Sequence, residues 1–393
     1  MTQYWIILLA IAVGVVFIAE KLKQPYPTFL VIFGLIIGVT PIPALEEVKQ
    51  YAINDTVFQT TVILIFLSAL LGDAALKLPV HELKENKKPI LLLAFIGTFL
   101  TFLIVSTLAY TILNLSLQQA LIFGSLMAAT DPVSVLSIFK AMGLNKRLSI
   151  IVEGESLAND GVAVVLFKIA IVTSALSFSG ALDASLEFVK VVIGGLFIGG
   201  LSGFLASRVT SRIDHYLVEI GLSIVLFYGA FEMAEIFHFS GVIAVVTAGL
   251  ILGTYGRNVG MSDLTHEKMD SFWEVIAFIS NALIFLMVGL EVGRVNFLDK
   301  GWIIAGSVLI VLAARFIAVY ISLAFDKSIP VSWKHIIAWG GLKGSLSIAL
   351  MLSVSPEFVG RELLLAMTFS NVVVSLLGQG ITIKKLVAFL KVE

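Results

Sequence analysis

The 393-residue sequence contains no cysteine and few charged residues. The lack of cysteine excludes disulfides, thiolate metal sites and cysteine nucleophiles. Only 13% of the residues are charged and 59% are hydrophobic, whereas a soluble globular domain has about 25% charged residues. A chain with so little polar surface could not cover itself in water, so we predict that it is embedded in lipid.

Long basic tracts are also missing. No run of Lys and Arg exceeds two adjacent residues, and the formal net charge is −1, so we expect no nucleic-acid partner. The N-terminus has neither a basic segment nor a small-residue cleavage site. We therefore interpret the apolar stretch from Tyr4 to Ile18 as a retained membrane span rather than a signal peptide. We expect no soluble domain and no cofactor.

Apolar segments long enough to cross a bilayer, about 20 residues each, recur along the whole chain. They predict an all-α polytopic membrane protein with about 13 transmembrane helices, which form a single unit over residues 1–393. The predicted spans are 4–20, 26–41, 57–76, 89–114, 118–138, 148–176, 186–207, 215–236, 239–254, 270–293, 301–325, 332–354 and 362–383.

Basic residues are distributed unevenly between the two sets of connecting segments. Of the 26 Lys and Arg residues, five fall on one side and three within spans, which leaves 26 − 5 − 3 = 18 on the other side. Under the positive-inside rule this asymmetry predicts a multi-pass protein of the cell (inner) membrane, with its N-terminus outside and its C-terminus in the cytoplasm. The five outer residues are Lys49, Lys190, Arg294, Lys300 and Arg361.

Ionisable residues also occur within the predicted spans. The three basic ones are Lys168, Arg315 and Lys343. Each charge near the middle of a bilayer costs about 2.5–3.5 kcal/mol on insertion scales, so these residues indicate a transport path. The acids at membrane depth or near it are Asp73, Asp131, Glu153, Glu155, Asp160, Glu219, Glu232, Glu235, Glu274 and Glu291.

A proline interrupts the fifth predicted span, in Ala129-Thr130-Asp131-Pro132. Proline removes a backbone donor and clashes with the preceding turn, so the helix should break there. A broken helix at membrane depth lines a cavity, where its freed backbone groups can coordinate ions. Thr130 offers a hydroxyl and a carbonyl, and Asp131 can neutralise a half-helix end. A simple proline kink with a capping Thr-Asp pair explains the motif equally well.

The sixth span contains the acidic string Glu153-Gly154-Glu155-Ser156-Leu157-Ala158-Asn159-Asp160. Ser156 and Asp160 are four residues apart and share one helix face. Asp160 lies about 18 Å along the helix, near mid-bilayer, and Glu153 falls on the same face nearer the cytoplasm, where it could line a funnel. A structural ion pair suits Glu155. Too few basic residues exist to pair every buried acid, so Asp160 is the predicted functional carboxylate.

Three glycines weaken the twelfth span, in Gly340-Gly341-Leu342-Lys343-Gly344-Ser345. Paired discontinuities in the two halves of a chain point to a transporter site, although close packing through small residues gives the same pattern. Arg315 stays protonated and needs a counter-charge at its depth. Lys168, about two turns beyond Asp160, is interpreted as a snorkelling or ion-paired side chain.

Together these motifs resemble the monovalent cation:proton antiporters, in particular the electroneutral sodium/proton exchanger branch. The resemblance rests on Thr130-Asp131-Pro132, Gly154-Glu155-Ser156-Leu157-Ala158-Asn159-Asp160, Arg315 and Gly340-Gly341-Leu342-Lys343-Gly344. It implies a homodimer in the lipid bilayer. Each subunit would have inverted repeats, two crossed discontinuous helices, an interface domain and a six-helix core.

The resemblance places the spans near 118–176 and 301–354 in that core. It implies that Asp160 is the exchanging carboxylate, with Thr130 and Ser156 as ligands of the Na+ ion. Further predicted ion-binding residues are Asn159, which supports the site, and Asp131.

The resemblance also implies roles for charged residues around the site. Glu155 and Arg315 would form a structural ion pair. Lys343 and Asp131 would offset the dipoles of the broken helices. Asp73 stands where relatives often have Glu in the third span, so the resemblance leaves its role open. The roles of Lys168 and Glu291 stay open as well, and Asp73 and Glu153 are further candidate site residues.

The expected reaction is electroneutral exchange of one Na+ for one H+, with Li+ as another transported ion. A mostly apolar cavity would favour the neutral form of Asp160, so a cation and a proton would compete for it, and either would neutralise it before the core moves. Asn159 rather than a second Asp precedes Asp160, which leaves one titrating group at the site.

Other functions fit less well. Potassium/proton exchange is the nearest alternative, because selectivity depends on cavity size and ligand number; organic-anion symport suits the Asn159-Asp160 pair poorly. An intramembrane aspartyl protease would need Gly-x-Gly before its second acid, whereas Leu70-Leu71-Gly72 precedes Asp73. Gly154-Glu155-Ser156-Leu157-Ala158 lacks the last glycine of a serine hydrolase elbow, and a channel gives no reason for a titrating acid at mid-membrane. We therefore expect no enzyme.

Overall fold

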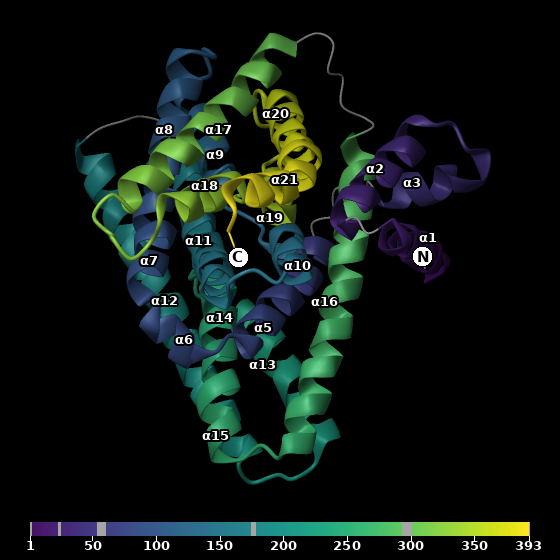
Figure 1. Ribbon diagram of the computed structural model, residues 1–393, viewed down its shortest axis with the longest axis vertical. Coiled ribbons are helices and arrows are strands. Elements are labelled where there is room, and N and C mark those ends of the chain that lie inside the picture. Colours follow the sequence, from purple (N-terminus) through teal and green to yellow (C-terminus); the bar gives the residue numbers. More distant parts are fainter. Residues whose placement is uncertain (1, 23–24, 53–59, 174–177, 293–300, 393) are drawn as a thin grey trace.

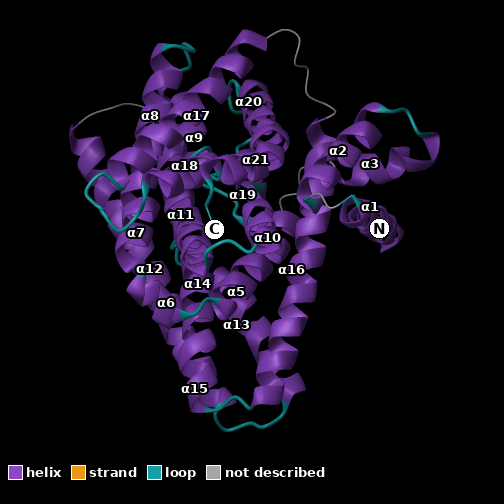
Figure 2. Ribbon diagram, viewed as in Figure 1, coloured by secondary structure: helices purple, strands orange, loops and turns teal. Residues whose placement is uncertain are grey.

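The computed structural model describes residues 2–22, 25–52, 60–173, 178–292 and 301–392. Every regular element in these ranges is helical, and no strand occurs in them (Figures 1 and 2). Helices satisfy their backbone groups internally, as lipid requires, and the all-helical prediction is confirmed. Arg294 and Lys300 lie outside the described residues, as do the ends of three predicted spans, at 57–59, 174–176 and 293.

Eight helices in the described ranges are long and apolar enough to cross a membrane, so the chain is a multi-pass membrane protein. A ninth span results if α2 (Tyr26–Val39) and the helical segment Pro43–Ala52, bent by 113°, are counted together. The eight contain α1 (Thr2–Lys21), α7 and α8 (Lys87–Leu91 and Thr98–Thr111), α12 (Phe178–Thr210), α13 (Tyr216–Ile236), α14 and α15 (Gly241–Ile251 and Arg257–Val259), α16 (Asp263–Val292), α17 (Gly301–Ser322), and α20 and α21 (Arg361–Val374 and Gly380–Leu390).

Several helices continue through a π-helical turn, which the sequence analysis treats as part of a plain span. Such turns are often found where a helix bends or a site is built. Two short helices, α3 (Glu46–Ala52) and α6 (Val80–Glu85), lie outside the predicted spans. The π-helical turns are Thr60–Leu67 before α5 (Ser68–Lys77), Leu92–Gly97 between α7 and α8, Leu252–Gly256 between α14 and α15, and Ser375–Gln379 between α20 and α21.

Two helices are interrupted where the sequence places breaks. The first consists of α9 (Leu117–Leu126) and α10 (Val133–Met142), and the second of α18 (Val331–Trp339) and α19 (Ser345–Leu352). The two non-helical segments touch, because the backbone N–H of Asp131 donates to the carbonyl of Leu342 at 2.8 Å. Backbone groups that the helices leave unpaired are therefore satisfied across the break.

The long helix α16 runs along one flank of the molecule and packs against α2 (Figure 1). A Cβ on Gly34 would lie 2.3 Å from the carbonyl oxygen of Leu286, and one on Gly289 would lie 2.4 Å from that of Val31. The two backbones thus approach more closely than any larger residue would permit. Helix α11 (Lys146–Val172) packs against α9 on the other side of the first interruption.

Candidate functional site

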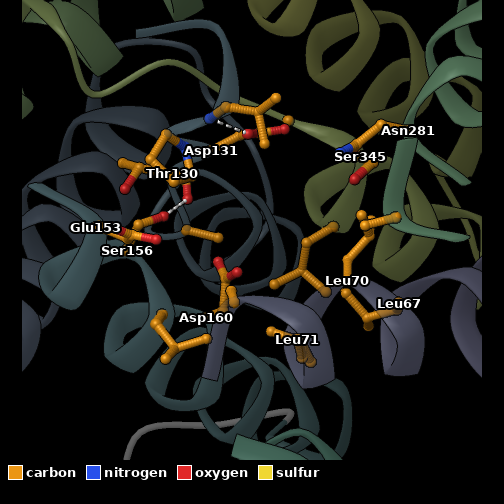
Figure 3. Close-up of a pocket in the computed structure, with 18 of the residues that line it drawn as sticks. Leu67, Leu70, Leu71, Thr130, Asp131, Glu153, Ser156, Asp160, Asn281 and Ser345 are labelled. Carbon is orange, nitrogen blue, oxygen red and sulfur yellow. Dashed lines mark hydrogen bonds between the residues drawn. The ribbon is translucent and has the colours of Figure 1, made fainter. Parts of the chain in front are cut away.

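A cavity of about 200 Å³ lies beside the two helix interruptions (Figure 3). Its wall is formed by both interrupted helices together with the π-helical turn before α5, α5 itself, α11 and α16. The structure therefore gathers residues from five separate parts of the sequence at one place. The residues singled out from the sequence that line it are Asp73, Thr130, Asp131, Glu153, Ser156 and Asp160.

Asp160 projects into this cavity from α11 (Figure 3). Its carboxylate makes no hydrogen bond and no ion pair with any residue that the structure describes. A carboxylate removed from bulk water without a protein partner requires a proton, a cation or ordered water. Asp160 is therefore placed to bind an ion from the cavity.

Ser156 and Asn159 hold the first interruption against α11. The Ser156 hydroxyl donates to the carbonyl of Thr130. The Asn159 side-chain amide donates to the Thr130 hydroxyl at 2.7 Å, and the Thr130 N–H donates to Asn159 Oδ1 at 3.4 Å. Since Ser156 lies one turn before Asp160, the oxygens of Thr130 and Ser156 are held on the wall of the cavity into which Asp160 projects. Asn159 does not line the cavity and acts behind this wall.

Asp131 lines the cavity but its carboxylate is engaged. Its Oδ1 accepts the backbone N–H of Val133 at 2.9 Å, at the start of α10. A Cβ on Gly344 would lie 2.3 Å from the Cβ of Asp131, so the glycine allows the second interruption to pack onto the first. The negative charge of Asp131 thus faces the positive end of a half-helix.

Glu155 and Arg315 form a buried ion pair between α11 and α17. Arg315 donates from Nη1 to Glu155 Oε1 at 2.6 Å and from Nη2 to Oε2 at 3.0 Å. Nη2 also donates to the carbonyl of Ile337 at 3.3 Å. The guanidinium is therefore committed to Glu155 and does not neutralise Asp160.

Lys343 points from the second interruption toward the end of α9. Its ammonium donates to the carbonyls of Met127 at 2.6 Å and Ala129 at 3.0 Å. These carbonyls follow the last turn of α9 and have no helical partner, and a cation is favourable at this negative end. The side chain is almost completely buried, at 2% exposure.

An ion pair lies on the part of the cavity wall that α5 contributes. Lys77 lies 2.8 Å from Asp73 Oδ1 and 3.9 Å from Glu274 Oε2. Asp73 is thus part of an ion pair on the cavity wall, and Glu153 lines the same cavity. The pairing of Asp73 with Lys77, one helical turn later, was visible in the sequence but was not predicted.

Asn281 of α16 and Ser345 of α19 also line the cavity, and the sequence analysis did not select them as site residues. A signal existed for Asn281, since it is a polar residue that opens the apolar run Ala282–Val288. Lys168 and Glu291 do not line this cavity. Lys168 pairs with both carboxylate oxygens of Glu235 at 2.9 Å.

Comparisons with known proteins identify the family of the chain. A family model described as "Sodium/hydrogen exchanger, transmembrane" matches residues 6–389. The chain is 52% identical over 387 residues to the Na(+)/H(+) antiporter NhaG of Bacillus atrophaeus, with 98% of this chain and 74% of the relative covered. It is 45% identical over 386 residues to the Na(+)/H(+) antiporter NhaH of Halobacillus dabanensis, with 97% of this chain and 96% of the relative covered.

The fold has a counterpart among solved structures. The sodium proton antiporter MjNhaP1 of Methanocaldococcus jannaschii superimposes with a TM-score of 0.81 over 99% of this chain and 98% of that chain, at 23% sequence identity. The two proteins therefore share a fold. Because the family model covers nearly the whole chain, the protein is a membrane transporter rather than an enzyme, and it belongs to the sodium/hydrogen exchanger family.

Proposed function

We propose that the chain is an electroneutral antiporter that exchanges one Na+ for one H+ at Asp160. The observation that carries the proposal is the carboxylate of Asp160, which has no partner among the described residues and lies on a cavity wall with Ser156 and Thr130. The names of the relatives, antiporters of Na+ and H+, support this choice of ions.

The ligand chemistry supports a hard monovalent cation. Such ions take oxygen ligands, and the wall near Asp160 offers a carboxylate, two hydroxyls and the Thr130 carbonyl. Asp160, Thr130 and Ser156 are the proposed ligands of Na+ or Li+, and Asn159 supports them through Thr130. A proton and a cation both neutralise the carboxylate, so binding of one excludes the other.

A stoichiometry of one to one follows from how the neighbouring acids are used. Glu155 is bound to Arg315, and Asp131 is bound to the start of α10. Asn159 has no charge. Asp73 is paired with Lys77, and Glu153 lies seven residues before Asp160 on α11. Asp160 is then the proposed exchanging carboxylate, and replacement of one cation by one proton on it moves no net charge across the membrane.

The roles of the remaining charges follow from the same contacts. The Glu155–Arg315 pair is proposed to be structural, because it ties α11 to α17 behind the cavity. Lys343 and Asp131 are proposed to offset the dipoles of the interrupted helices. Asp73 and Glu153 are proposed to attract cations toward Asp160 from the cavity wall.

The architecture is proposed to comprise thirteen spans arranged as inverted repeats. Six of these spans would form the core, and they consist of α7 with α8, α9 with α10, α11, α17, α18 with α19, and α20 with α21. The packing of these helices around the two interruptions supports this division. The remaining helices would form the interface of a homodimer. Movement of the core past α5 and α16 would open the cavity to each side in turn. An empty, ionised Asp160 is costly to carry through the occluded state, which suppresses leak.

The proposed orientation places the N-terminus outside and the C-terminus in the cytoplasm of the cell (inner) membrane. It rests on the 18-to-5 distribution of basic residues. In this orientation the end of α5 and the start of α11 face the cytoplasm. Asp73 and Glu153 then lie on the cytoplasmic side of Asp160.

Exchange in proteoliposomes tests the proposal. Purified protein is reconstituted with a pH-sensitive dye inside, and Na+, Li+ or K+ is added after a pH gradient is set. We expect Na+ and Li+ to collapse the gradient, no dependence on membrane potential, and no exchange by Asp160→Asn. Glu187→Gln, at an exposed site on α12, serves as a control that retains exchange. Retained exchange in Asp160→Asn would move the site elsewhere, and a current would contradict the stoichiometry. Equal exchange with K+ would favour a potassium/proton antiporter.

A further inference from the structure

The long helix α16 contributes two residues to the cavity wall, Ala277 and Asn281, which are one turn apart. Asn281 is the polar member of this face and is only 6% exposed. Its side-chain amide makes no hydrogen bond with the described part of the chain. A buried amide without a protein partner is costly, so this amide is placed to hold water or a ligand of the cavity.

Ser345 has the same property on the neighbouring helix. It is the first residue of α19, is 8% exposed, and its hydroxyl makes no hydrogen bond with the residues described. Helices α16 and α19 pack against one another. Figure 3 shows the Asn281 and Ser345 side chains together, across the cavity from Thr130 and Ser156. These two polar groups, without hydrogen-bond partners in the described part of the chain, therefore face the proposed cation ligands.

The protein atoms beside Asp160 do not surround an ion. The hydroxyl hydrogen of Ser156 is used on the Thr130 carbonyl, and the Thr130 hydroxyl is held by Asn159, so both sets of oxygens lie on one wall. A cavity of about 200 Å³ has room for several water molecules. An ion bound to that wall keeps waters on its open side, and those waters need hydrogen-bond partners opposite.

We propose that Asn281 and Ser345 hold the water molecules that complete the shell of the cation at Asp160, and that Asn281 thereby sets alkali-ion selectivity. An amide and a hydroxyl each both donate and accept, as a bridging water requires. A smaller ion of the same charge loses more free energy when it is stripped of water, so a site that keeps waters on the ion favours Li+ and Na+ over K+. Asn281 is a positioning residue in this scheme. The inference rests on the proposed exchange at Asp160.

Two substitutions at position 281 that differ little in volume from one another test the inference. Asn281→Ala removes the water-binding group, whereas Asn281→Ser replaces the amide by a hydroxyl that can still bind water. Ser280→Ala is the matched control, because Ser280 is a buried polar neighbour on α16 that does not line the cavity. Each variant is reconstituted, and initial rates are measured against Na+, Li+ and K+ concentration. Thermal unfolding with and without each salt reports ion binding directly.

We expect Asn281→Ala to raise the apparent KM for Na+ and Li+ by about three- to tenfold, with kcat and the KM for K+ changed less than twofold. Asn281→Ser should recover most of the loss, and Ser280→Ala should behave as wild type. Ser345→Ala should act in the same direction, with less than additive effect when combined with Asn281→Ala, because both hold one set of waters.

Three results would overturn the inference. The first is a KM for Na+ in Asn281→Ala that stays within twofold of wild type. The second is an equal rise of this KM in the Ala and Ser variants, which would indicate that Asn281 acts through packing. The third is an equal rise of the KM for all three ions. The proposed function fails separately, through retained exchange in Asp160→Asn, so the two failures are distinguishable.

Discussion

Arg315 donates hydrogen bonds to both carboxylate oxygens of Glu155, at 2.6 and 3.0 Å, although the two residues are 160 positions apart in the chain. Both side chains are almost fully buried. Removing one member leaves an uncompensated buried charge, which typically costs about 3–5 kcal/mol. Glu155→Gln should therefore lower the unfolding temperature of the purified protein in detergent. The exposed pair Lys190–Glu187 offers a control, since Glu187→Gln should change stability by less than about 1 kcal/mol.

The double substitution Glu155→Met with Arg315→Met sharpens this prediction. Apolar residues of similar size avoid the buried charge, and such replacements are often neutral or stabilising. We expect the double variant to regain most of the stability that Glu155→Gln loses. A double variant as unstable as the single one would show that the ion pair itself, rather than the absence of an unpaired charge, stabilises the fold.

Lys343 supplies the hydrogen bonds of two buried carbonyls, those of Met127 and Ala129. Lys343→Met leaves both without a donor, and each unsatisfied buried group costs about 1–3 kcal/mol. We expect lower thermal stability and a loss of exchange, because the end of α9 beside Thr130 loses its support. Lys343→Arg should retain part of both. Stability and initial rates measured on the same preparations check the prediction, and wild-type behaviour of Lys343→Met would contradict it.

Lys168 joins α11, inside the proposed core, to Glu235 at the end of α13 and to the carbonyl of Phe239, at 2.9 Å in each case. Movement of the core against α13 would have to separate these groups. The pair is about one-third exposed, so its contribution to stability should be at most about 1 kcal/mol. We expect Glu235→Gln to change the maximal exchange rate while the KM for Na+ stays within twofold. A KM shift without a rate change would argue against a conformational role.

Asp326 lies in the connection between α17 and α18 and accepts the Ser328 N–H at 3.0 Å. Burial raises the pKa of Asp326, but hydrogen bonds from Ser328 and the charges of Lys88 and Arg147 outweigh this effect, so its pKa lies below the usual value. A lowered pKa in the folded state adds stability above the unfolded pKa of about 3.9, and this is lost as the pH falls through the folded value.

The comparison of wild type with Asp326→Asn tests this pH dependence of stability. We expect the variant to unfold at a lower temperature than wild type near pH 7 and pH 5, and the difference between the two unfolding temperatures to become smaller near pH 3. Asp263→Asn, at an exposed aspartate at the start of α16, controls for the loss of a surface charge. A gap that widens as the pH falls would contradict the assignment.

Much of the cavity could be predicted from local sequence. Pro132 and the glycines around Leu342 forecast both helix breaks, because each residue type disfavours a helix for a known backbone reason. The four-residue spacing of Ser156 and Asp160 predicted their shared face. These inferences need only neighbours along one helix.

Contacts between helices that are distant in the sequence could not be predicted from local sequence. Periodicity shows which face a residue occupies but not which helix lies opposite, so the partner of Lys168 stayed open. The Glu155–Arg315 pair came from a family resemblance rather than from spacing. Asn281 carries no charge, and the importance of an uncharged amide becomes evident only from the cavity that it lines.

The contact of Lys343 with Met127 has a consequence for the order of events during synthesis. The carbonyl is made 216 residues before its ammonium donor, and Ser347 reaches back similarly to Leu126 over 221 residues. Since a chain folds from its N-terminus as it leaves the ribosome, the end of α9 is made long before Lys343 and Ser347, the donors to its carbonyls. The ion pathway cannot be complete until α18 and α19 have been made, and this interval is therefore the stage most open to membrane quality-control proteases.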